Sequence, residues 1–189
     1  PHDRRQISLR DFDWADMIDR TDRIRLLIDP ASPYAQNAAW ALGRKMDDII
    51  IEAAFGTAKS GKTGGTSVSH DAASQIAVNY VESGGATNSG LTIAKLRKAK
   101  QLLDANETDP SDPRYIIVTS KQVTDLLQTT EVTSSDFNSI KALVAGEVNT
   151  FMGFQFVRTE RVATDASSHR RVIAYAKSGR LMAVGADIN

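Results

Sequence analysis

A pattern typical of phosphate binding lies upstream of the middle of the chain. Residues 56–63 spell G-x-x-x-x-G-K-T, the P-loop pattern, in which backbone amides and a lysine hold nucleotide phosphates and a threonine hydroxyl binds magnesium. The mechanism needs a strand before the loop and a helix that begins at the lysine. Here a long predicted helix precedes the pattern, and Gly64 and Gly65, which disfavour a helix, follow it. We therefore interpret residues 56–63 as a flexible glycine-rich loop, with a P-loop nucleotide hydrolase as the alternative from another functional class.

A pair of carboxylates one helical turn apart offers a second possible site. Asp48 and Glu52 are four residues apart in the predicted helix, a spacing at which two carboxylates can chelate a metal or divide acid and base roles. Arg44 lies one turn earlier, and no histidine is nearby in the sequence. We therefore favour an ion pair between Arg44 and Asp48, either solvated or between subunits.

The other residue types that carry chemistry are scattered or missing. The chain has no cysteine, and His2, His70 and His169 stand in terminal or polar segments without metal-ligand spacing. No G-x-S-x-G motif is present, so the serine-rich runs are explained by capping and turns. We therefore expect that the protein is not an enzyme. We assign no catalytic, cofactor-binding or metal-ligating residue, and we expect no cofactor.

The composition is that of a soluble globular protein. Of the 189 residues, 41% are hydrophobic and 24% are charged, and Lys plus Arg equals Asp plus Glu at 23 each. Net charge thus does not favour a nucleic-acid or anionic membrane partner, and a protein partner is expected. No run approaches the roughly 18 apolar residues needed to span a bilayer, so we expect no membrane partner.

The first half of the chain is dominated by one long predicted helix. Ser32 and Pro33 form a start signal, and Gly56 supplies the stop, which predicts a helix over 33–55. Its apolar positions recur at helical spacing and are Tyr34, Ala38, Leu42, Met46, Ile49, Ile50 and Ala53. We also predict a strand around Ile7 and Leu9, a short helix over 17–28, and loop, short strand (76–80) and loop between Gly56 and Gly90.

The second half mixes helices and strands without regular alternation, which predicts the α+β class. Thr92 caps a helix that ends at Asn106, Ser120 caps a second that runs through Leu127, and a third runs over 135–146. The apolar runs predict strands at 115–118, 154–157, 172–175 and 181–184.

Several of these segments, taken in order, resemble the major capsid proteins of tailed bacteriophages. The run LLIDPASPYAQNAAWALGRKMDDIIIEAAFGTA resembles the long spine helix of that family, with its aspartate-proline entry and glycine exit. The likeness continues through LTIAKLRKAKQLLDAN, RYIIVTSKQVTDLL and VTSSDFNSIKALVAGEVNTFMGFQFVRTERV, so that it covers residues 4–189. No single segment is diagnostic, and the ordered set carries the resemblance.

The resemblance implies the Hong Kong 97 fold. On that basis residues 1–90 would hold part of the peripheral domain, with the return strand of the extended loop and the spine helix at about 33–55. Residues 91–189 would hold part of the axial domain. The N-terminal arm, most of the extended loop and the last strands of the family have no counterpart in the sequence, so we expect a fragment of the fold.

The same resemblance implies a structural role without catalysis. We expect a coat protein that self-assembles, through pentamers and hexamers of itself, into the icosahedral shell of a tailed phage or prophage. Scaffold, portal or decoration proteins would be further partners, and the shell would enclose DNA without sequence-specific binding. The location would be the virion capsid, assembled in the bacterial host cytoplasm. An encapsulin-like compartment, which encloses cargo enzymes in a shell of the same fold, is the alternative.

Overall fold

The computed structural model describes residues 4–15, 31–127 apart from 83, 85 and 86, 149–181, and 183. The chain divides into two compact units. The first comprises Pro1–Ser69 with Met182–Asn189, and the second comprises His70–Leu181. Both helices and sheets are present, so the predicted α+β class is confirmed.

The first unit is built on one long helix. Helix α2 spans Ala31–Phe55, so the predicted helix is confirmed and begins two residues earlier than expected. It stops at Gly56, whose amide still donates to the carbonyl of Glu52 at 2.9 Å. Only Ala38 and Ile51 are buried among the helix side chains that the structure describes. The helix is therefore long but contributes few side chains to a hydrophobic core.

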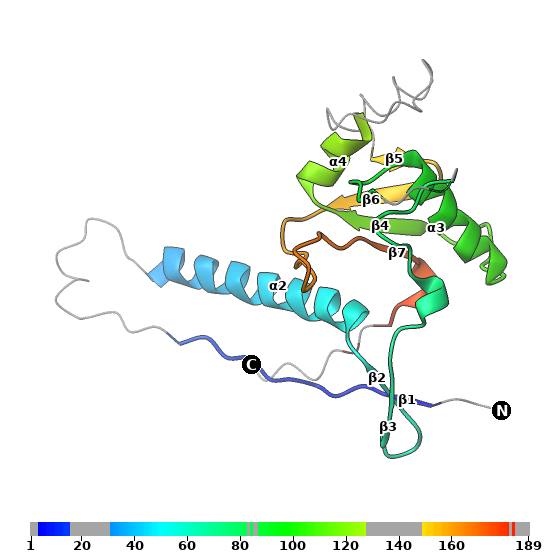
Figure 1. The fold of residues 1–189 in the computed structure, drawn as a ribbon. Helices are drawn as coiled ribbons and strands as arrows, with labels where there is room; N and C mark the ends of the chain where they lie inside the picture. The colour runs from blue at the N-terminus through cyan, green and yellow to red at the C-terminus, as the bar shows by residue number, and fades with distance from the viewer. Residues whose placement is uncertain are drawn as a thin grey trace. The chain divides into compact units, whose positions relative to one another are not determined.

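A small antiparallel sheet completes the described part of the first unit (Figure 1). Strands β1 (Arg5–Gln6), β2 (Ala58–Ser60) and β3 (Thr66–Val68) pair in the order β1-β2-β3. The expectation of a loop between Gly56 and the strand predicted at 76–80 was therefore wrong, because residues 58–68 form a hairpin. The N-terminal strand lies at Arg5–Gln6, before the predicted Ile7 and Leu9, because only those two residues meet β2.

Two glycines in the left-handed region of the backbone make the hairpin turn. Gly61 has φ of 93° and Gly64 has φ of 65°. The amide of Gly61 donates to the carbonyl of Arg4 at 2.9 Å, which fixes the turn to β1. The positive φ favours glycine at position 64, and a Cβ atom there would also have to displace the exposed side-chain amide of Gln6.

The second unit contains a four-stranded mixed sheet of order β5-β6-β4-β7. Its strands are β4 (Arg114–Val118), β5 (Thr150–Phe151), β6 (Phe154–Arg158) and β7 (Ile173–Ala176). Strand β4 pairs in parallel with β6 and antiparallel with β7. The three strands predicted at 115–118, 154–157 and 172–175 are therefore confirmed to within one residue at each end.

Two helices pack with one face of this sheet. Helix α3 spans Ile93–Ala105, with the Thr92 hydroxyl accepting from the amide of Lys95 at 3.3 Å, as the sequence predicted. Helix α4 spans Ser120–Leu127. The core cluster comprises Leu91, Ile93, Leu96, Ala99, Ile116, Val118, Val123, Leu126, Phe151, Phe154 and Phe156.

Some details of the predicted elements differ from the structure. Ser120 is the first residue of α4, so the capping position belongs to Thr119, whose amide donates to the side chain of Gln122 at 2.9 Å. Residues 76–80 form no strand, and a short 3₁₀ helix, η1 (Ala72–Ser74), precedes them. Leu181 and Ala183 are not in a strand. The predicted helices at 17–28 and 135–146, with 182 and 184, lie outside the described residues.

Lys95 fastens the connection between η1 and α3. Its ammonium group donates to the carbonyls of Val78 and Ser89 at 2.7 Å each and of Gly90 at 2.8 Å. Burial lowers the pKa of Lys95, and the nearby carboxylate of Asp125 opposes this shift. The connection has little regular secondary structure. Its carbonyls therefore accept hydrogen bonds from the Lys95 ammonium instead of from a neighbouring strand or helical turn.

We predict that Lys95→Met lowers the free energy of unfolding by about 1–3 kcal/mol, because two partly buried carbonyls and one exposed carbonyl lose a charged donor. Denaturant titration measures the change. Lys98→Met is the matched control, since Lys98 is on the same helix and, among the described residues, donates only to the side chain of Gln101, at 3.1 Å. Equal losses in the two variants would show that Lys95 does not fasten the connection.

We also predict that Gly64→Ala opens the hairpin. The left-handed backbone at residue 64 costs a non-glycine residue roughly 1–2 kcal/mol, and the added methyl group displaces Gln6. Gly65→Ala should be close to neutral, because its Cβ atom would meet only the Thr63 hydroxyl, at 3.8 Å. Hydrogen exchange of the amides in residues 58–68 should accelerate in the first variant alone, and similar exchange in both would contradict the prediction.

Candidate functional site

The residues of the P-loop pattern lie in a helix end and a hairpin. Gly56 follows the last residue of α2, and Lys62 and Thr63 lie in the turn between β2 and β3. A helix precedes the pattern where a P-loop has a strand, and a strand follows where a P-loop has a helix. The described backbone therefore lacks the helix N-terminus that would point amides at a nucleotide phosphate.

The carboxylate pair lies on α2 as predicted. Asp48 is half-buried and Glu52 is exposed. Within residues 4–15, 31–127 and 149–181 no three histidine or acidic side chains are grouped as a metal would need. The ion pair between Arg44 and Asp48 stays a prediction.

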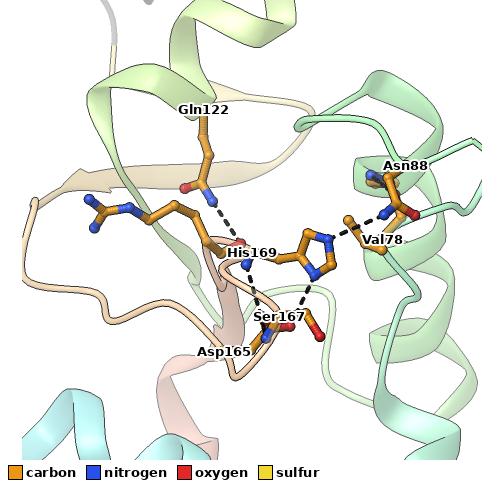
Figure 2. Close-up of polar contacts among 8 residues, drawn as sticks. Val78, Asn88, Gln122, Asp165, Ser167 and His169 are labelled. Carbon is orange, nitrogen blue, oxygen red and sulfur yellow. Dashed lines mark hydrogen bonds and ion pairs between the residues drawn. The ribbon is translucent and has the colours of Figure 1, made fainter.

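The structure does bring one histidine into a polar cluster, which Figure 2 shows. His169 lies in the connection between β6 and β7, and its Nδ1 atom is 3.3 Å from a carboxylate oxygen of Asp165. Its Nε2 atom is 3.2 Å from the side-chain amide of Asn88, in the connection that Lys95 fastens. With Nδ1 protonated, the ring donates to Asp165 and accepts from Asn88. This histidine joins two loops that are far apart in sequence.

Asp165 organises the turn that presents His169. Its second carboxylate oxygen accepts from the amides of Ser167 at 2.9 Å and His169 at 2.8 Å, while Ser168 adopts φ of 63°. The hydrogen bond from the His169 amide is the largest cause that lowers the pKa of Asp165. The D-x-x-x-H spacing is visible in the sequence, although nothing there shows that Asn88 completes the cluster.

The start of α4 holds the same connection from a second side. The Gln122 side chain donates to the carbonyls of Arg170 and Arg171 at 3.3 Å each. The Glu160 carboxylate accepts from the hydroxyl of Ser120 at 2.5 Å and from its amide at 2.7 Å. These two hydrogen bonds, with a smaller contribution from Arg170, lower the pKa of Glu160. A carboxylate is favourable at a helix N-terminus.

The turn between α3 and β4 is held in a similar way. Asp112 accepts from the amide of Ser178 at 3.0 Å and from its hydroxyl, and these bonds lower the pKa of Asp112. The Arg114 side chain is only 7% exposed and contacts the carboxylate of Asp104 at 2.6 Å. These polar groups fix loops, turns and the ends of helices and strands to neighbouring segments.

Large apolar side chains are exposed in the first unit. On α2 the exposed fractions are 56% for Trp40, 50% for Met46 and 41% for Tyr34. The helical spacing that marked Tyr34 and Met46 as apolar positions therefore does not mean burial within this chain. The extended N-terminal segment exposes four more such residues, Ile7, Leu9, Phe12 and Trp14. Exposed apolar side chains that gather in one unit are typical of surfaces that contact other proteins.

One contact within the unit keeps part of this segment close to α2. The ammonium of Lys45 lies 5.6 Å from the centre of the Phe12 ring, within the range of a cation–π interaction. None of the described helices is long and apolar enough to cross a membrane. The exposed apolar residues of α2 and of residues 7–14 are a candidate surface for contact with other protein subunits.

Comparisons with known proteins bear on this reading. A family model described as "Phage capsid protein" matches residues 1–189. A solved structure from Mycobacterium phage Che8 is similar, with a TM-score of 0.46 and 15% sequence identity. The match covers 79% of this chain and 47% of that chain, so this chain spans about half of that protein's length. No curated protein matches the sequence.

The family model covers every residue of the chain, and the described residues combine loop-fixing polar clusters with an exposed apolar surface. The chain belongs to the phage capsid protein family, and it is a structural protein of the phage capsid.

Proposed function

We propose that the protein is a subunit of the icosahedral shell of a tailed phage or prophage and that it assembles through pentamers and hexamers of itself. The shell encloses DNA without reading its sequence and forms in the cytoplasm of the bacterial host. Scaffold, portal or decoration proteins are further partners. The family match supports the phage shell over an encapsulin-like compartment.

We propose the Hong Kong 97 fold for the subunit, with a peripheral domain in residues 1–90 and an axial domain in residues 91–189. The division of the chain into two compact units supports a two-domain organisation, although the second unit begins at His70 and so takes in residues 70–90. The 25-residue helix α2 in the first unit fits the role of a spine helix.

The observation that carries the shell function is the arrangement of exposed apolar residues on α2. Tyr34, Trp40 and Met46 are each six residues apart, so their directions around the helix axis differ by about 120°. A helix with large exposed apolar side chains in three directions has no single buried face. Burial of all three side chains requires protein on several sides, which neighbouring subunits supply in a closed shell.

We also propose that the protein has no enzymatic activity. The P-loop residues lie outside a P-loop context, and the polar clusters of the second unit are used in holding loops. Shell assembly needs surfaces that many copies share, because each subunit contact is repeated by symmetry.

We predict that Trp40→Asp blocks shell assembly. An exposed substitution should change the free energy of unfolding by no more than about 0.5 kcal/mol, so the subunit stays folded while a charge enters the contact surface. Trp40→Phe is the control and should assemble, since it keeps an apolar ring. Negative-stain electron microscopy and size-exclusion chromatography of the full chain measure assembly.

One outcome would contradict the proposed function, and another would contradict only the role of the α2 surface. One is a wild-type chain that stays monomeric under every assembly condition tested, including co-expression with the neighbouring phage structural genes. The other is normal shells from Trp40→Asp, which would remove the α2 surface from the subunit contacts.

A further inference from the structure

Positive charge is concentrated in the small sheet of the first unit, although the whole chain is neutral. Arg4, Arg5, Lys59 and Lys62 are all exposed. Residues 4–10 and 56–70, which include the three strands and the turn, hold no aspartate or glutamate. None of the four cations forms an ion pair with a residue that the structure describes. The chain as a whole has equal numbers of basic and acidic residues, but this part of its surface is basic.

The turn of the hairpin adds neutral donors to these cations. The backbone amides of Lys62, Thr63 and Gly65 have no hydrogen-bond acceptor among the described residues. The Thr63 hydroxyl belongs to an exposed side chain at the same turn. Lysine, backbone amides and hydroxyl groups are the donors that proteins use toward phosphate oxygens. The turn thus offers anion-binding chemistry in the absence of a P-loop.

The strand register places the cations in different directions. Arg5 is directly opposite Ser60, and Lys59 is directly opposite Gln6 and Ser67. Successive residues of a strand face opposite sides of a sheet, so Arg5 and Lys59 lie on opposite faces. The ammonium of Lys59 donates to the Ser67 hydroxyl at 2.7 Å, which braces the two strands. With Lys62 at the turn, positive charge surrounds the hairpin.

The side chains of the hairpin favour a nucleic acid over a protein as the partner. Val68, at 38% exposed, is the one large exposed apolar residue in residues 56–70 of the described chain. Protein interfaces have an apolar centre, whereas protein–DNA interfaces are polar and strongly positive. The apolar residues of this unit instead lie on α2 and in residues 7–14.

We propose that the basic hairpin, defined as residues 58–68 with Arg4 and Arg5 of the adjoining segment, binds the phosphate backbone of the enclosed duplex DNA. The contact is independent of sequence, because it uses charges, amides and hydroxyls toward phosphates and no base edges. The inference rests on the proposed function, since the shell brings the hairpin to DNA. It adds a contact surface to a shell that otherwise only surrounds the genome.

The test compares the full-length wild-type chain with Lys59→Glu/Lys62→Glu. Fluorescence anisotropy measures binding to a short labelled duplex of random sequence over a range of salt concentrations. We expect the affinity of the double variant at low salt to fall about tenfold or more. The plot of log affinity against log salt concentration should become shallower by about two units, because each lost phosphate contact removes roughly 0.9.

Lys100→Glu/Lys177→Glu is the matched control. It changes the net charge by the same amount at two exposed lysines of the second unit. The control should keep the wild-type salt dependence. Equal loss of affinity in both double variants would overturn the proposal, because net charge alone would then explain binding. Absence of binding by the wild-type chain at low salt would overturn it as well.

A third result would assign the hairpin to a different partner. If Lys59→Glu/Lys62→Glu prevented shell assembly and Asp11→Lys/Asp13→Lys restored it, the hairpin would contact acidic residues of a neighbouring subunit. Shell formation is scored separately by electron microscopy. Shells without hairpin-dependent DNA binding would refute the inference alone, whereas a wild-type chain that forms no shell would refute the proposed function.

Discussion

The second unit depends on the burial of one face of its four-stranded sheet. Ile116 and Val118 of β4 and Phe154 of β6 are at most 1% exposed, and they meet Leu96 of α3 and Leu126 of α4 in one cluster. Burial of a large apolar side chain contributes about 1.5–3 kcal/mol. The parallel pairing of β4 with β6 holds these residues in register, so the described loops that leave these two strands start from fixed positions.

Polar side chains then fix two long connections of the unit, one between η1 and α3 and one between β6 and β7. Lys95 donates hydrogen bonds to three carbonyls of the first connection, and Gln122 donates to two carbonyls of the second. His169 joins the two connections through its contact with Asn88. Backbone groups in irregular segments need partners as much as those in helices and strands do. These clusters contain residue types that often perform catalysis. In this unit their side chains form hydrogen bonds that hold segments of the chain together.

The first unit follows a different principle. Its long helix buries few of its described side chains, and its sheet has strands of two or three residues with exposed cations. A structural subunit of a phage capsid can leave such surfaces open, because the assembly supplies their partners. The apolar residues on α2 suit contacts between subunits, and the basic hairpin suits the phosphates of DNA.

The sequence by itself determined much of the local structure. Caps, glycine stops and apolar periodicity located α2, α3 and strands β4, β6 and β7, because these signals act over a few residues. The mismatch between the P-loop pattern and its flanking segments was also visible in the sequence. Only the tertiary structure decided that residues 58–68 form a hairpin with Arg5–Gln6, that Asn88 meets His169, and that Tyr34 and Met46 are exposed. These features depend on contacts between distant segments, and a residue's own neighbours in sequence carry no record of such contacts.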